Sequence, residues 1–212
     1  MNKEKIESGQ KLFPQEEVEL VRSGNLELFD RYLENYSLCK EAEFELLKPE
    51  NEACFKHYIS GNVAHYRLEE EVEIKLLQSG KGELIALYIC EGHKFSPAAQ
   101  EMLIKQGKAA LVAMYFHRFF LGKKLERELI KRGDAELFEK YMQRLGNNLY
   151  MDNVTELVKI ANAKIVECYI NRRPLPDNAE RELVLRGNER LLQVYEAKWW
   201  KLSLFGKKKG GQ

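Results

Sequence analysis

The 212-residue sequence predicts an all-α fold, an α-α superhelix (solenoid) of about seven two-helix repeats. Three observations predict it. A tyrosine recurs seven times at spacings of 26 to 30 residues, a leucine stands twelve residues before each of these tyrosines, and a glycine lies between the two in most repeats. Helices this short are marginal in isolation, so we expect the repeats to stack on one another and share one core.

The tyrosine register marks the repeats. Because packing positions recur in an array while binding positions vary, we expect these rings to form the repeat core, each hydroxyl bonded to a backbone carbonyl at an inter-repeat turn. The alternative is a groove of phenol rings that stacks on bases or peptides. The register consists of Tyr32, Tyr58, Tyr88, Tyr115, Tyr141, Tyr169 and Tyr195.

The first helix of each repeat carries the leucine column and an aliphatic residue directly after it, beginning with Leu20 and Val21. A glycine such as Gly24 then suits a left-handed helix stop. The next residue is a predicted N-cap in five repeats, and these are Asn25, Asn51, Asp134, Asn162 and Asn188. Apolar residues four and three positions before the tyrosine, and one after it, form the stripe of a second helix.

The connections between repeats vary in length and carry apolar anchors before a cap or a proline, as at Phe13, Phe95 and Leu175. With these features the chain resembles the HEAT and armadillo class of helix-pair repeats over residues 16–203, although its repeat is shorter.

We expect residues 1–15 to form a flexible segment or cap, 16–203 a single repeat domain, and 204–212 a basic, disordered tail. Trp199 and Trp200 are expected to seal the last repeat.

The composition favours a soluble protein. The 34 basic and 33 acidic side chains give a formal charge of +1, and the longest apolar run is far below the roughly 20 residues that span a membrane. The N-terminus has no apolar stretch of the kind that a secretory signal needs. Four cysteines are too few for a disulfide framework, so we expect reduced thiols and a cytoplasmic location.

No pattern typical of catalysis is present, so we expect no enzyme, no cofactor and no metal. The glycines occur singly at helix ends, and no histidine has a nucleophile at a suitable spacing. Cys54 with His57 and Cys90 with His93 have the spacing of zinc ligands, but the two pairs occupy different places in their repeats.

Large residues outside the core columns are the candidates for a partner surface, because aromatic and arginine side chains dominate interface hot spots. They are Tyr36, His117, Arg118, Phe119, Phe120, Arg172 and Arg173. The alternative for Phe119 and Phe120 is that they cover the underside of their connection. We therefore expect a non-enzymatic interaction module that binds a protein or peptide.

Two other functions stay open. Basic residues of the C-terminal half could track a phosphate backbone, although the near-neutral net charge argues against nucleic acid. These residues are Arg118, Lys123, Lys124, Arg127, Lys131, Arg132, Lys140, Arg144, Arg172, Arg173, Arg181, Arg186 and Arg190. A structural, self-associating protein is the other possibility.

Overall fold

The computed structural model describes residues 2–60, 66–146, 148–160 and 162–199, and every regular element in these ranges is a helix. The helices follow one another in pairs, so the predicted all-α helical-repeat fold class is confirmed. Contacts divide the chain into two compact units, unit 1 (residues 1–102) and unit 2 (residues 103–212), each described separately below. None of the described helices has the length and apolar character needed to cross a membrane.

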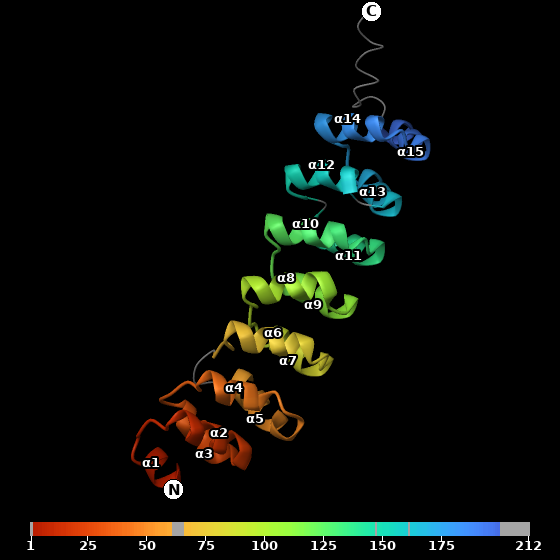
Figure 1. The fold of residues 1–212 in the computed structure, drawn as a ribbon. Helices are drawn as coiled ribbons and strands as arrows, with labels where there is room; N and C mark the ends of the chain where they lie inside the picture. Colours follow the sequence, from red (N-terminus) through yellow and green to blue (C-terminus); the bar gives the residue numbers. More distant parts are fainter. Residues whose placement is uncertain (1, 61–65, 147, 161, 200–212) are drawn as a thin grey trace, which may run out of the picture. The chain divides into compact units, whose positions relative to one another are not determined.

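Unit 1 contains α1 (Asn2–Glu7) and three helix pairs (Figure 1). The pairs are α2 (Pro14–Ser23) with α3 (Leu26–Leu33), α4 (Lys40–Leu46) with α5 (Glu52–Ser60), and α6 (Glu70–Gln78) with α7 (Gly82–Cys90). A 3-10 turn, Pro49–Asn51, precedes α5. Helix α4 packs between α2 and α6, and α3 packs on α5, so the first and second helices form separate layers. Helix α1 packs on α3 and buries Ile6.

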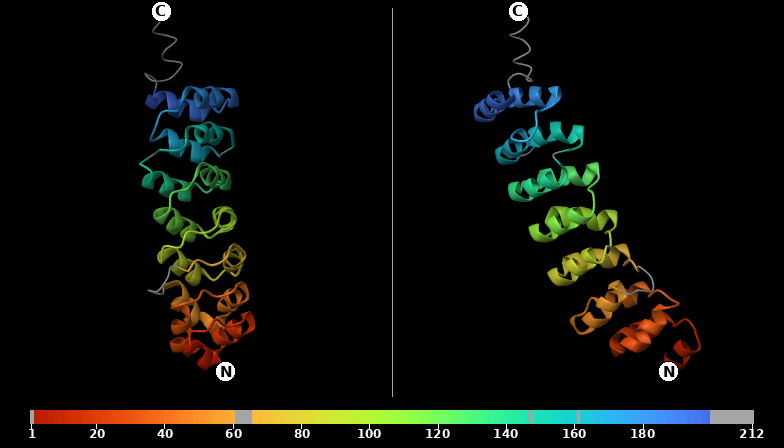
Figure 2. Two further views of the ribbon diagram at one scale, coloured as in Figure 1. Left: turned by 90° about the vertical axis from the view of Figure 1, so that its left-hand side faces the viewer. Right: turned by 180° about the vertical axis from the view of Figure 1, so that it is seen from behind.

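Unit 2 has the same two-layer organisation (Figure 2). Helix α8 (Pro97–Gln106) spans the boundary between the units and is followed by α9 (Ala109–Arg118). The remaining pairs are α10 (Lys123–Arg132) with α11 (Ala135–Arg144), α12 (Met151–Ile160) with α13 (Ala163–Ile170), and α14 (Asp177–Arg186) with α15 (Glu189–Trp199). Helices α10, α12 and α14 pack in one row, and α9, α11, α13 and α15 pack in the other.

The residues expected to repeat in the core are buried. All seven tyrosines of the register are at most 4% exposed. A further buried column lies twenty residues before each tyrosine and consists of Leu12, Leu38, Leu68, Phe95, Leu121, Leu149 and Leu175. The expectation that Phe13 is an anchor is wrong, because Leu12 occupies the anchor position and Phe13 is 69% exposed.

The turns inside the repeats follow the prediction with two exceptions. Gly24, Gly80, Gly133 and Gly187 have positive φ, and Asn25, Asp134, Asn162 and Asn188 each accept the expected backbone N–H. Gly107 does not adopt the left-handed conformation. Asn51 is not an N-cap, because it is buried in the 3-10 turn and its Nδ2 donates to the Glu45 carbonyl at 2.9 Å.

The tyrosine hydroxyls do not follow the prediction of a backbone acceptor. Five of them donate to a glutamate fifteen residues earlier in the same repeat, on the first helix. The pairs are Tyr32 with Glu17, Tyr58 with Glu43, Tyr88 with Glu73, Tyr141 with Glu126 and Tyr195 with Glu180. Burial raises the pKa of each of these phenols, and the neighbouring carboxylate adds to the shift.

Four of these glutamates, Glu17, Glu43, Glu73 and Glu126, also accept a backbone N–H from the segment that leads into the next repeat. Glu17 and Glu43 use their second oxygen to accept the backbone N–H groups of Cys39 (2.5 Å) and Glu69 (2.8 Å), the N-cap residues of α4 and α6. Glu126 accepts from the Tyr150 backbone in the same way. Such bonds satisfy an otherwise unpaired buried carboxylate, and they fix one repeat against its neighbour.

The predicted domain boundaries can be compared with the helix boundaries where the structure describes the chain. Residues 1–15 contain α1 and the beginning of α2, and α15 ends at Trp199. The predicted continuation of the last helix to Ser203, the role of Trp200 and the tail 204–212 lie outside the described residues. Where one repeat domain was expected over 16–203, contacts group the chain into two units.

Candidate partner surface

The candidate residues of repeat 4 lie in the last turn of α9 and directly after it. His117, Arg118 and Phe120 are exposed, and Phe119 is half-buried with its ring 4.9 Å from that of Tyr115. The covering role considered for the two phenylalanines therefore applies to Phe119, whereas Phe120 is 73% exposed. An exposed phenylalanine beside basic residues is typical of an interaction surface.

Arg144 joins these residues from the next repeat. Its guanidinium lies 4.3 Å from the centre of the Phe120 ring, and its Nε donates to the His117 carbonyl at 3.1 Å. Arg144 Nη1 is buried and has no hydrogen-bond acceptor in the described part of the chain. Arg144 is one of the basic residues of the C-terminal half, and its position in the sequence does not indicate the contact with Phe120.

The arginines of repeat 6 differ from one another. Arg172 is held in place, because its Nη2 donates to Glu139 at 2.7 Å and its Nη1 donates to the Cys168 carbonyl at 3.3 Å. Arg173 is exposed. We call the set His117, Arg118, Phe119, Phe120, Arg144, Arg172 and Arg173 the connecting edge of unit 2, because all of it lies at or just after the ends of second helices.

Tyr36 does not belong to this set. It lies in unit 1, where its hydroxyl donates to the Gly9 carbonyl at 2.8 Å and its ring centre is 5.3 Å from that of Tyr32. These contacts tie the segment between α1 and α2 to the first repeat, which is a structural role.

The charges are segregated between the two units, which the net charge of +1 conceals. Unit 1 has 12 basic and 20 acidic side chains, a net of −8, whereas unit 2 has 22 basic and 13 acidic, a net of +9. Several basic residues of unit 2 are paired within the fold, as Lys123 is with Asp152 and Arg127 with Glu156. Arg132 donates to the Ile104 carbonyl. The remaining excess still gives unit 2 a positive field.

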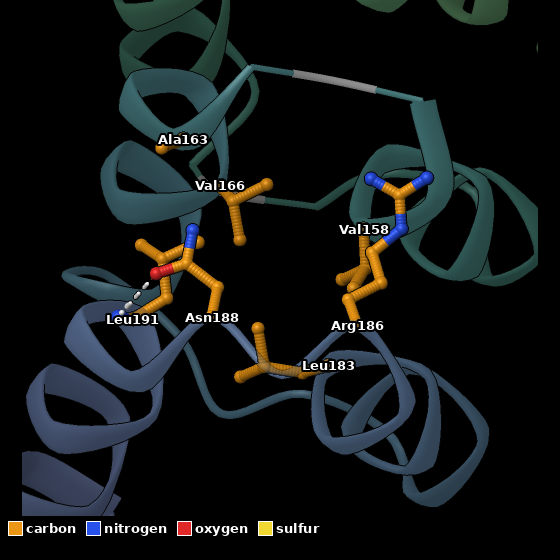
Figure 3. Close-up of a pocket in the computed structure, with 7 residues that line it drawn as sticks. All are labelled: Val158, Ala163, Val166, Leu183, Arg186, Asn188 and Leu191. Atoms are coloured by element: carbon orange, nitrogen blue, oxygen red, sulfur yellow. Dashed lines mark hydrogen bonds between the residues drawn. The ribbon is translucent and has the colours of Figure 1, made fainter.

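A pocket of about 380 Å³ lies between the last two repeats of unit 2 (Figure 3). Val158 and Val166 line it from the α12–α13 pair, and Leu183 lines it from α14. Phenylalanine occupies the position of Val166 in three other repeats, as Phe29, Phe55 and Phe138. Val166 fills less space than a phenylalanine would at this position, and we interpret the pocket as incomplete packing between these two repeats.

The cysteines and histidines with zinc-like spacing have other contacts. Cys54 Sγ donates to the Val21 carbonyl, His57 Nδ1 lies 3.1 Å from Asp30, and His93 Nε2 lies 2.8 Å from the Ile59 carbonyl. Each contact joins one repeat to the preceding one. Among the described residues, no group of three or more metal-ligating side chains is close enough to hold an ion.

The only recurrent chemistry in the described residues is thus packing, capping and ion pairing between repeats, with the connecting edge as an exposed aromatic and basic exception. Comparison with protein-family models, with curated proteins and with solved structures finds no match.

Proposed function

We propose that the protein is a non-enzymatic interaction module that binds an acidic protein or peptide along the connecting edge of unit 2. The observation that carries the proposal is the pair of Phe120 and Arg144, an exposed aromatic ring stacked under a guanidinium in a unit of net charge +9. Aromatic and arginine side chains together supply apolar area and directional donors, the combination found at interface hot spots.

The acidic character of the partner follows from the donors on this edge. Arg118 and Arg173 are exposed, and Arg144 Nη1 lacks an acceptor among the described residues. A carboxylate or carbonyl of a partner would supply that acceptor, and charge-assisted bonds of this kind are about twice as strong as neutral ones. The positive field of unit 2 would also accelerate the encounter with an acidic partner.

The test is affinity capture from the source organism, followed by binding measurements with the purified partner. Phe120→Ala with Arg118→Glu should weaken binding of that partner about tenfold or more. The matched control is Phe13→Ala with Lys11→Glu, which makes the same two changes on exposed residues of unit 1 and should leave binding unchanged. Equal loss in both variants, or no loss in either, would contradict the proposal.

The second candidate is a nucleic-acid binder, and the net charge of +9 on unit 2 favours it. A gel-shift assay with the full chain across a salt series distinguishes the two. Binding to nucleic acid with a steep loss as salt rises supports this second function. No binding at about 20 mM salt, where screening is weakest, removes it.

A further inference from the structure

A second surface lies in unit 1, on the layer formed by α2, α4 and α6. A cleft of about 340 Å³ between α2 and α4 is lined by Pro14, Gln15, Val18, Glu19, Arg22 and Glu41. We call it the α2–α4 cleft. Its Arg22 is exposed and bonded to Glu45 at 3.0 and 3.2 Å, and its two acidic side chains, Glu19 and Glu41, are exposed as well.

An apolar line runs along this layer from the cleft. Val18, Phe44 and Ile74 occupy the same repeat position on α2, α4 and α6, and all three are half-buried. Unit 2 places Arg127, Thr155 and Arg181 at that position. Unit 1 therefore combines partly exposed apolar side chains with acidic neighbours, a surface suited to a basic segment that also carries large apolar residues.

The chain itself contains such a segment beyond the described helices. Residues 200–212 have four lysines and no acidic residue, together with two leucines and two large aromatic residues. Unit 2 without this segment, residues 103–199, has 18 basic and 13 acidic side chains, a net of +5. The segment is thus repelled by the charge of its own unit and attracted by the net of −8 on unit 1.

We propose that the α2–α4 cleft binds residues 200–212 of a second copy of this chain. Apolar side chains of the segment pack on Val18 and Phe44, and its lysines pair with Glu19 and Glu41. A second copy is the better source because 13 extended residues span at most about 45 Å. Neighbouring helices pack about 8–10 Å apart, and a segment that ran back along its own unit from α15 to α9 would pass three such spacings. That distance is more than half of the span of about 45 Å.

The experiment uses three full-length variants and sedimentation velocity at low salt. The cleft variant is Glu19→Lys with Glu41→Lys, and the tail variant is Lys207→Glu, Lys208→Glu and Lys209→Glu. The control variant, Glu27→Lys with Glu34→Lys, makes the same charge change as the cleft variant on exposed residues of α3 and its C-terminus. Circular dichroism of each variant establishes that it is folded.

Wild type and the control variant should self-associate with rising concentration at about 20 mM salt and dissociate in about 500 mM salt. The cleft and tail variants should each associate about tenfold or more weakly. A mixture of the two should form a heterodimer, because one still has the tail and the other still has the cleft. A monomeric wild type, a cleft variant that associates like the control, or a mixture that stays monomeric would each overturn the proposal.

Discussion

The hydroxyl of Tyr141 donates to the buried carboxylate of Glu126 at 3.1 Å, and the same carboxylate accepts the backbone N–H of Tyr150 in the next repeat at 3.0 Å. The phenol therefore belongs to a hydrogen-bonded group that joins two repeats, and its removal affects more than its own packing.

Tyr141→Phe should lower the free energy of unfolding by about 1–3 kcal/mol, because the buried Glu126 loses a donor. Tyr169→Phe is the matched control in the same unit, since Val154 stands where the other repeats have an acid or amide, and its cost should be below about 0.5 kcal/mol. Urea unfolding followed by circular dichroism measures both. Equal costs would show that the glutamate does not matter.

The second prediction concerns pH. Burial raises the pKa of the Glu43 carboxyl to about 7 in the folded protein, against an ordinary value of 4.5. The folded state therefore binds this proton more tightly, and the stability that protonation provides is lost as pH rises from 4.5 through 7. The Glu43→Gln variant has no such loss. Its free energy of unfolding minus that of wild type should therefore increase by about 3 kcal/mol as the pH rises over this range. Denaturant unfolding at several pH values tests this. A difference that stays constant with pH would contradict it.

The third prediction separates two roles of Asn162. Its Oδ1 accepts the Ile165 N–H at 3.1 Å, while its Nδ2 donates to the Gly133 carbonyl of the preceding repeat at 2.8 Å. Asn162→Asp keeps the helix cap, loses the donor and places a carboxylate beside a carbonyl. We expect a cost of about 1–2 kcal/mol. Asn25→Asp, at a cap in the first repeat, should be neutral within about 0.5 kcal/mol. Thermal unfolding compares them, and an equal effect would assign Asn162 to capping alone.

The fourth prediction concerns the pocket beside Val166. Val166→Phe should fill space and raise the free energy of unfolding by about 1 kcal/mol. Val112 has the same repeat position and is also buried, but it does not line this pocket, so Val112→Phe should cost about 1–3 kcal/mol through overpacking. Destabilisation by both substitutions would show that the space near Val166 does not accept a ring.

The repeat architecture was predictable because its signals are apolar or conformational. A tyrosine such as Tyr58 and a leucine such as Leu46 stand at the same two positions in all seven repeats, and a glycine such as Gly133 marks the helix end in most of them. The single sequence therefore shows the same pattern seven times. The sequence does not indicate the glutamate partners of the five tyrosines, and the reason is physical. A glutamate on an amphipathic helix usually faces solvent, and only the fold shows that Glu43 is buried against Tyr58.

The connecting edge was predicted in part. Phe120 and Arg118 stand out in the sequence because they lie outside the core columns, whereas the sequence marks Arg144 only as a positive charge. Its stacking on Phe120 depends on how consecutive repeats align, which spacing along one chain does not give. The segregation of charge also required the division into units, because in the whole chain the −8 and +9 of the two units sum to +1.

The carboxylates that join repeats give the array a polarity. Glu17, Glu43 and Glu126 each take the phenol from their own repeat and the amide from the one that follows. Removing repeats from the N-terminal end leaves the surviving members of this group with both donors, whereas removing the repeats that follow Glu126 takes away the amide that it accepts from. The chain should therefore tolerate the deletion of N-terminal repeats better than the deletion of C-terminal repeats. A designed array would need a capping repeat after the final glutamate.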